Sequence, residues 1–238
     1  MPDVQFKDLV IDVTAGDGRA AAVARFWATA LGQESAVRKD GSFYLVAPEG
    51  APTRTVRLDE VPESPAGKSR VHIDIRVADG DPAPLLAAGA TVVRAPGDDQ
   101  WWVLNDPDGV PLCVFAPHPM APDALGPFEL VVDAHDPSAI AEWWAARTGG
   151  TVGRREGTTF AWVEGAAGFP YMFWVFTEVP EPKTVKNRVH WDVTLVDASL
   201  DDLLAAGATL VRARDPEISW TVLADPEGNE FCVFEPRQ

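Results

Sequence analysis

Hydrophobic and polar positions alternate with a period of two in several short segments, and one longer segment has a helical period. In the second half of the chain, FELVVDA (128–134) and RVHWDVTLV (188–196) alternate and are rich in β-branched and aromatic residues, which predicts strands. The segment DPSAIAEWWAARTGG (136–150) predicts a helix, with Asp136 as its N-cap and Pro137 at the first helical position.

The remainder of this half predicts one more helix and six further short strands. The helix is ASLDDLLAAGA (198–208), with Asp197 before it as the cap, and the residues 225–228 (DPEG) predict a hairpin turn. The strand-like segments lie at 151–156, 159–165, 170–179, 209–214, 219–225 and 229–236. This order is two βαβββ modules with mostly antiparallel strands, and we therefore predict the α+β class.

The first half of the chain repeats the second. LLAAGAT occurs at 85–91 and at 203–209, and WWVLNDPDGVPLCVF (101–115) matches WTVLADPEGNEFCVF (220–234). A period this long indicates duplicated domains rather than a solenoid of short repeats. We predict two domains, 1–118 and 127–238, joined by a Pro- and Ala-rich linker at 119–126, with four βαβββ modules in all.

Composition and charge narrow the function classes. The 238 residues carry a formal net charge of −16, which disfavours nucleic acid and anionic membrane surfaces as partners. Two cysteines make no disulfide framework, and the sequence has no signal peptide and no transmembrane segment, so we expect a cytoplasmic protein. A nucleophile elbow, a P-loop and a dinucleotide fingerprint are absent from the sequence.

Three stretches carry a resemblance to a known family. They are KNRVHWDV (186–193), LLAAGAT and ADPEGNEFCVF (224–234), each with a partner in the first copy. Together they resemble the vicinal oxygen chelate superfamily, which includes glyoxalase I, bleomycin-resistance proteins and extradiol dioxygenases, and more narrowly the glyoxalase-like domain of bacterial proteins. The resemblance implies cupped sheets around a cavity and, in the metalloenzymes, four ligands from the first and last strands of the modules.

The ligand positions that the resemblance implies fall, in each copy, on an acid at the first position and a histidine at the third, and on a cysteine at the fourth, where the family usually has a glutamate. These residues are Asp8, His72 and Cys113 in the first copy and Glu129, His190 and Cys232 in the second. The second position falls near 54–56 and 171–173, where no His, Gln or carboxylate occurs. Glu129, His190 and Cys232 could hold Zn²⁺, Ni²⁺, Mn²⁺ or Fe²⁺, but no cofactor is favoured, because the histidines could equally be buried hydrogen-bonding groups and the cysteines core residues.

Strand alternation adds further residues to the expected cavity walls. In the first copy they are Val10, Asp12, Asp74, Arg76 and Phe115, and in the second they are Val131, Asp133, Asp192, Thr194 and Phe234. Asp133 or Asp192 could act as a general base, or these acids could bind backbone amides or pair with Arg70 and Arg188. Trp27, Trp143 and Trp144 are expected in the core, whereas Trp101, Trp162, Trp174 and Trp220 lie on strands and could pack there or line a cavity.

Two functions and one variation follow. The first is metal-free binding of a small organic molecule in a cavity of each domain, by a monomer or a homodimer. The alternative is a metal-dependent lyase, isomerase or dioxygenase. The variation is that one copy binds while the other only supports the fold, the second copy being closer to the family pattern.

Overall fold

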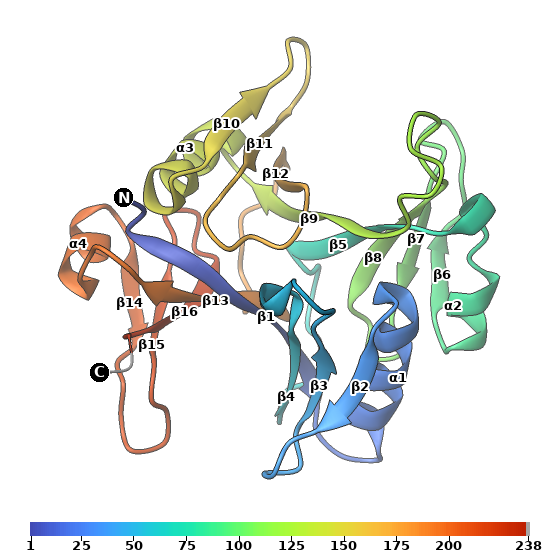
Figure 1. Ribbon diagram of the computed structural model, residues 1–238, viewed down its shortest axis with the longest axis horizontal. Helices are drawn as coiled ribbons and strands as arrows, with labels where there is room; N and C mark the ends of the chain where they lie inside the picture. The colour runs from blue at the N-terminus through green and yellow to red at the C-terminus, as the bar shows by residue number, and fades with distance from the viewer. Residues whose placement is uncertain (237–238) are drawn as a thin grey trace.

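The computed structural model describes residues 1–236, which form four consecutive βαβββ modules (Figure 1). Module 1 comprises β1 (Val4–Thr14), α1 (Arg19–Leu31), β2 (Glu34–Val37), β3 (Phe43–Val46), the 3-10 turn η1 (Pro52–Arg54) and β4 (Val56–Val61). Module 2 comprises β5 (Val71–Arg76), the 3-10 turn η2 (Ala78–Gly80), α2 (Ala83–Ala87), β6 (Thr91–Arg94), β7 (Trp102–Asn105) and β8 (Pro111–Phe115). Module 3 comprises β9 (Gly126–Ala134), α3 (Pro137–Thr148), β10 (Thr151–Arg154), β11 (Phe160–Glu164) and β12 (Phe173–Glu178). Module 4 comprises β13 (Val189–Leu195), α4 (Leu200–Ala205), β14 (Thr209–Arg212), β15 (Thr221–Ala224) and β16 (Glu230–Phe234). The α+β prediction and its four modules are confirmed.

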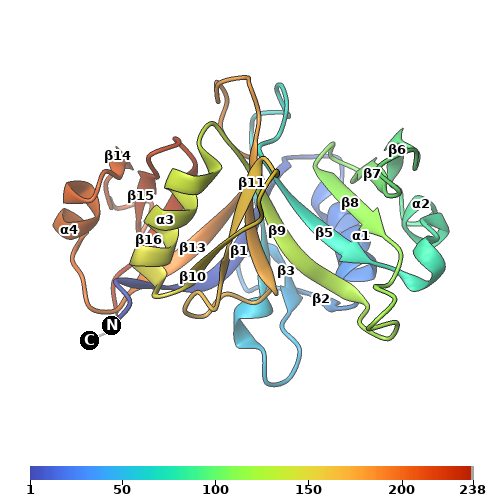
Figure 2. The same cartoon turned by 90° about the horizontal axis from the view of Figure 1, so that it is seen from above.

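The modules combine across the sequence repeat to form two eight-stranded sheets (Figure 2). Sheet A has the order β14-β15-β16-β13-β1-β4-β3-β2 and contains modules 1 and 4. Sheet B has the order β10-β11-β12-β9-β5-β8-β7-β6 and contains modules 2 and 3. The first strands of the modules join each sheet, because β1 pairs antiparallel with β13 and β5 with β9. Each sheet therefore takes half of its strands from each copy, and a complete cavity within each copy, as expected from the sequence, is not what forms. The predicted limits 1–118 and 127–238 follow the repeat and do not coincide with the sheets.

Alternation along the central strands separates the core from the concave faces. On β1, Leu9, Ile11 and Val13 are buried in the hydrophobic core, while Asp8 and Asp12 belong to the opposite face of the strand. The largest fully buried side chains are mainly aromatic, and they include Trp27, Trp144, Trp174, Trp191, Phe6, Phe26, Phe176 and Phe231. Trp27 and Trp144 lie in the core as predicted, and Trp174 is also a core residue rather than part of a cavity wall.

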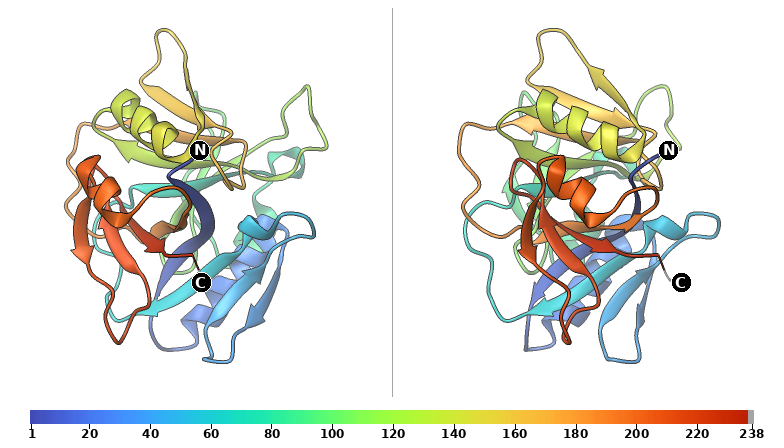
Figure 3. Two further views of the ribbon diagram at one scale, coloured as in Figure 1. Left: turned by 60° about the vertical axis from the view of Figure 1, so that its left-hand side comes forward. Right: turned by 90° about the vertical axis from the view of Figure 1, so that its left-hand side faces the viewer.

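The N-terminal strand is fixed by module 3, so that the start of the chain lies beside the end of α3 (Figure 3). The amide of Asp3 donates to the carbonyl of Arg147 at 2.8 Å, and the amide of Phe6 donates to Ala167 at 2.8 Å. Gly168 follows at φ +72°, and a Cβ there would lie 2.5 Å from the carbonyl oxygen of Phe6. Only glycine allows the loop to approach β1 this closely.

The predicted helix cap is confirmed for α3 in module 3 and is wrong for α4 in module 4. Asp136 caps α3, since its carboxylate accepts the amide of Ala139 at 3.0 Å. In α4 the cap is Ser199, which forms a capping box with Asp202, and Asp197 does not have the predicted role. Ser199 prevails because it can accept from the third helical residue while Asp202 reaches back to the amide of Ser199.

A buried aspartate in each D-P-[DE]-G hairpin holds a helix tryptophan. The indole of Trp27 donates to Asp106 at 2.8 Å, and the indole of Trp144 donates to Asp225 at 3.1 Å. Burial raises the pKa of both carboxyl groups to about 6. These bonds connect α1 to the β7–β8 hairpin and α3 to the β15–β16 hairpin, and so they link the two sheets within each sequence copy.

Replacing Trp27 with phenylalanine is expected to lower the free energy of unfolding by about 1–3 kcal/mol, since it removes the indole donor from buried Asp106 and leaves space in the core. Urea denaturation measures the change. Trp220→Phe is the control, because Trp220 is only partly buried. Equal losses in the two variants would contradict the role given to the indole hydrogen bond.

No helix in residues 1–236 is long and apolar enough to cross a bilayer. The cytoplasmic location and the monomeric or homodimeric state stay predictions.

Candidate functional site

The side chains expected to face a cavity gather on sheet B from both copies. β5 supplies His72 and Asp74, β8 supplies Cys113, and β9 supplies Glu129 and Asp133. Asp74 lies opposite Glu129 in the β5–β9 register and opposite Cys113 in the β5–β8 register. The two copies thus contribute acids to a single concave surface.

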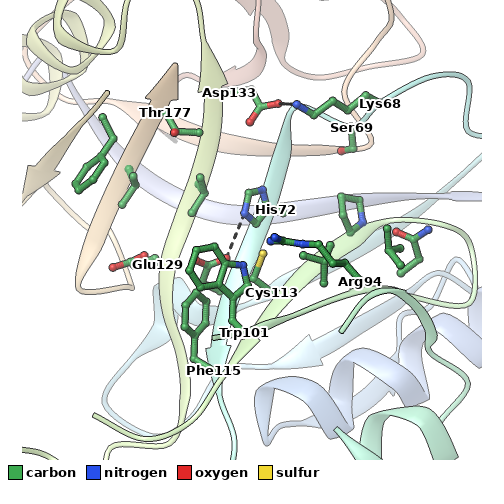
Figure 4. A pocket seen from close by; sticks show the side chains of 18 of the residues that line it. Lys68, Ser69, His72, Arg94, Trp101, Cys113, Phe115, Glu129, Asp133 and Thr177 are labelled. Carbon is green, nitrogen blue, oxygen red and sulfur yellow. Dashed lines mark ion pairs between the residues drawn. The ribbon is translucent and has the colours of Figure 1, made fainter. Parts of the chain in front are cut away.

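This surface encloses a cavity of about 860 Å³ (Figure 4). Its aromatic walls come from Trp101, Phe115, Phe160, Trp162 and Phe173. Its charged and hydrogen-bonding groups include Lys68, His72, Asp74, Arg94, Cys113, Glu129, Asp133 and Arg155. Trp101 stacks on Phe115 with the ring centres 5.2 Å apart, so part of the wall is a flat aromatic surface.

His72, Asp74 and Cys113 form a compact cluster in the cavity wall. Their nitrogen, oxygen and sulfur atoms lie within 4.8 Å of one another, and Nε2 of His72 is 3.2 Å from Oδ1 of Asp74. Burial acts to lower the pKa of His72, but hydrogen bonding to Asp74 and Cys113 raises it well above its usual value. Burial also raises the pKa of the Cys113 thiol. The structure therefore groups an imidazole, a carboxyl group and a thiol at one place in the cavity wall.

Glu129 has the most perturbed carboxyl group on the cavity wall. Burial, followed by the neighbouring charge of Asp74, raises its pKa to about 7, although Arg76 and His72 act in the opposite direction. The guanidinium of Arg76 lies 3.7 Å from the ring centre of Phe128. A carboxyl group with this pKa can exchange a proton near neutral pH or bind a cation.

Asp133 and two of the cations around the cavity, Lys68 and Arg94, form ion pairs within the protein. Asp133 is 2.8 Å from the ammonium of Lys68, and Arg70 is 3.9 Å away, so the predicted pairing with Arg70 is present but secondary. At the exposed rim, Arg94 pairs with Asp99 and lies 5.6 Å from the ring of Trp101. Asp133 is thus engaged in an ion pair, and its role as a general base stays a prediction.

Sheet A contains the counterparts of these residues, but with cations among them. Lys7 pairs with Asp8, and its ammonium is 3.2 Å from Asp192 and 4.2 Å from the ring centre of Phe234. Arg57 is 4.0 Å from Asp192 and 6.0 Å from the ring of Trp220. Burial raises the pKa of Asp192 to about 6, while Lys7 and Arg57 act against that rise. Asp8 and Asp192 in sheet A therefore have lysine and arginine side chains of the protein itself as charge partners.

The pKa values of His72 and His190 are shifted in opposite directions, because different charged groups surround them. Burial and the ammonium of Lys186 lower the pKa of His190 to about 4, so this imidazole is neutral, and its Nδ1 has no hydrogen-bond partner. Lys186 itself pairs with Asp12 at 2.6 Å. Burial raises the pKa of the Cys232 thiol.

The structure does not bring together the predicted metal set of Glu129, His190 and Cys232. Glu129 is on β9 in sheet B, whereas His190 and Cys232 are on β13 and β16 in sheet A. The remaining predicted residues divide in the same way. His72, Asp74, Cys113, Phe115 and Asp133 are in sheet B, and Asp8, Asp12, Asp192, Thr194, Trp220 and Phe234 are in or beside sheet A. The predicted residues divide in this way because modules 1 and 4 form sheet A, whereas modules 2 and 3 form sheet B.

Sequence reasoning missed the cations that decide the character of each site. These are Lys7, Arg57 and Lys186 in sheet A and Lys68, Arg94 and Arg155 around the cavity of sheet B. Alternation in VRLDEV (56–61) would have placed Arg57 on the same face as Asp59. Phe160 and Phe173 were also missed, because no charge or motif distinguishes them from core residues.

The four-ligand metal set implied by the resemblance is incomplete in sheet B. Its first and last strands provide Glu129, His72 and Cys113, but the residue opposite Glu129 on β12 is Phe173, which has no donor atom. In addition, Nε2 of His72 lies 3.2 Å from Oδ1 of Asp74. These residues do not fit that four-ligand set.

Comparisons with known proteins identify a family and related folds for this chain. The sequence profile of a family described as "Glyoxalase-like domain" matches residues 8–115 and 129–234. Among curated proteins, none matches the chain significantly. Glyoxalase I from Zea mays is similar in fold, with a TM-score of 0.67, 14% identity, and coverage of 98% of this chain and 92% of that one. A putative dioxygenase from Bacillus subtilis has a TM-score of 0.63 and 14% identity, over 100% of this chain and 86% of its own. The chain belongs to the glyoxalase-like domain family, with two copies of that domain in tandem.

Proposed function

We propose that the protein binds one small organic molecule per chain, in the cavity of sheet B. The observation that carries this proposal is the cavity itself. Its volume of about 860 Å³ is in the range of small-molecule sites, and its aromatic walls surround a few convergent polar groups. The stacked Trp101 and Phe115 rings favour a planar ligand, since flat rings bury large apolar areas against each other.

Sheet B supports this function better than sheet A. In sheet A, Lys7 and Arg57 lie among the matching acids and aromatic rings. In sheet B, the position of Arg57 is taken by Val175, because Arg57 pairs with Val10 on β1 and Val175 pairs with the equivalent Val131 on β9. The proposal thus keeps the idea of one binding site and one supporting site, but each site belongs to a sheet rather than to a copy.

Val131→Phe is expected to abolish ligand binding, because Val131 is 6% exposed and lies on the cavity-facing side of β9. A larger ring at this position fills the space that the ligand would use. Saturation-transfer NMR with uncharged fused-ring aromatic compounds measures the effect, and wild type should bind one molecule per chain. Val211→Phe is the control, since Val211 is exposed on β14. Undiminished binding by the Val131 variant would place the ligand elsewhere.

A second candidate function, a metal-dependent reaction, is favoured by the three donor groups of His72, Asp74 and Cys113, which lie within 4.8 Å of one another. His190, Asp192 and Cys232 form the equivalent cluster in sheet A. Imidazole, carboxylate and thiolate are all competent Zn²⁺ ligands. Metal analysis of protein purified without chelators separates the candidates. Near-stoichiometric metal that is lost in His72→Ala or in His190→Ala would favour this second function and identify the cluster that binds the metal. Metal-free protein that gains none from added Zn²⁺, Ni²⁺, Mn²⁺ or Fe²⁺ would exclude it.

A further inference from the structure

We infer that the cavity of sheet B selects an organic cation, an amine or a guanidine on a planar body, and that Glu129 is its counter-ion. This inference rests on the proposed function and names the class of ligand for the same cavity. Its basis is the internal comparison between the two sheets, because each site is built from the same strand positions.

The stacked aromatic pair is present in both sheets. Trp101 and Phe115 have ring centres 5.2 Å apart at 25° in sheet B, and Trp220 and Phe234 have ring centres 5.5 Å apart at 28° in sheet A. The acids correspond as well, since Asp8 lies opposite Asp192 in sheet A and Glu129 lies opposite Asp74 in sheet B. Each sheet therefore sets two carboxyl groups near one flat aromatic surface.

In sheet A this arrangement holds cations from the chain itself. The ammonium of Lys7 is 4.2 Å from the centre of the Phe234 ring and 3.2 Å from Asp192. The guanidinium of Arg57 is 6.0 Å from the ring of Trp220 and 4.0 Å from Asp192. Aromatic faces and carboxylates both attract cations, so the two attractions act together.

In sheet B the corresponding positions are apolar. Val175 replaces Arg57, and Phe128, the residue before Glu129, replaces Lys7. Phe128 packs its ring against the edge of Phe115 at 5.4 Å, and Val175 borders the open cavity. The space used by the Arg57 guanidinium in sheet A is thus available to a ligand in sheet B.

Among the acids that line the cavity, Glu129 is the one with no cation within 4.0 Å among residues 1–236, since the guanidinium of Arg76, which lies over the ring of Phe128, is farther from it than that. His72 is 3.2 Å from Asp74, and Lys68 is 2.8 Å from Asp133. Arg94 and Arg155 are exposed at the rim, and Arg94 pairs with Asp99. An ion pair formed with Glu129 inside the cavity would be shielded from water, which strengthens it relative to a surface pair.

The test uses three planar probes of similar size. These are 9-aminoacridine, a cation at neutral pH, 9-anthracenemethanol, which is uncharged, and the anion 9-anthracenecarboxylate. Isothermal titration calorimetry at about pH 8 is expected to show the cation binding one site per chain at least about tenfold more tightly than the other two.

Two substitutions probe the counter-ion. Glu129→Gln should remove the preference for the cation while keeping the shape of the cavity. Asp8→Asn is the matched control, because it removes the same charge from the counterpart of Glu129 and should leave the preference unchanged. Both variants change the net charge of −16 equally, so a general attraction of cations to an acidic protein would affect both alike.

A third substitution recreates the internal cation. Val175→Arg should place a guanidinium in the cavity, as Arg57 does in sheet A, and should reduce binding of 9-aminoacridine at least about tenfold. Val211→Arg is the control for the added charge, because Val211 is exposed on β14 outside the cavity, and it should leave binding of 9-aminoacridine unchanged.

The outcomes distinguish this inference from the function on which it rests. Equal binding of the three probes, or a preference that survives Glu129→Gln, would overturn the inference and leave the binding function in place. Failure of all three probes, together with no response to Val131→Phe in the NMR experiment, would overturn both.

Discussion

Replacing Arg188 with alanine is expected to lower the free energy of unfolding by about 3 kcal/mol, because it removes a charge partner from a buried carboxylate. Arg188 directly precedes β13 in sheet A, and its Nη2 donates to Asp108 at 2.8 Å. Asp108 lies in the β7–β8 hairpin of sheet B and also accepts from the amide of Thr14 at 2.7 Å and from Arg19 at 3.0 Å. The ion pair therefore connects the two sheets where water is largely excluded.

Urea denaturation of the single variants and of the Arg188→Ala/Asp108→Ala double variant isolates the interaction energy. Arg70→Ala is the matched control, since Arg70 precedes β5 as Arg188 precedes β13. Its removal should cost less, about 1 kcal/mol, because Arg70 is 3.9 Å from Asp133, whose nearer partner is Lys68, whereas Arg188 is 2.8 Å from Asp108. Equal losses at the two arginines, or additive effects of Arg188→Ala and Asp108→Ala, would contradict the link between the sheets.

Glu129→Gln is expected to stabilise the protein, by up to about 3 kcal/mol at about pH 8. The pKa of Glu129 is raised from 4.5 to about 7 in the folded chain, mainly by burial, so its ionised form is disfavoured there. Between these two values the folded state holds a proton that the unfolded state releases, and stability falls as pH rises. Above about pH 7 the full cost is present, and glutamine avoids it.

The gain should therefore shrink to about 1 kcal/mol at about pH 5.5 and disappear below the unfolded pKa. Thermal or urea unfolding across this pH range measures it, with Glu49→Gln as the control, because Glu49 is exposed in a loop. Surface substitutions of that kind change stability by less than about 0.5 kcal/mol. A gain at Glu129 that does not depend on pH would show that burial of its charge is not the cause.

The period-two alternation identified the part of the cavity wall that lies on the central strands. It placed Glu129, Val131 and Asp133 on one face of β9 and His72 and Asp74 on one face of β5, and all five line the cavity. The repeat and the hairpin motif similarly predicted four modules. These features are local, since each depends on residues close together in the sequence.

The pairing of modules could not be predicted in the same way. The first strands of all four modules present similar edges, so either partner satisfies the local pattern. The choice is made by contacts between distant residues, such as the apolar pairs of Leu9 with Trp191 and Ile73 with Leu130 in the strand registers. For the same reason the sequence did not show that Arg57 and Lys7 approach Asp192, which lies at the other end of the chain.

The division of each sheet between the copies also has an evolutionary consequence. In a symmetric dimer of identical single-copy chains, each substitution would occur in both sheets at once. An arginine that fills the cavity of one sheet would therefore fill the cavity of the other. After duplication and fusion, the residues at positions 57 and 175 can change independently. One sheet can then lose its ligand and gain internal ion pairs, as Arg57 and Lys7 provide, while the other keeps an open cavity at Val175. Fusion thus allows the two sheets to take separate roles within a single chain.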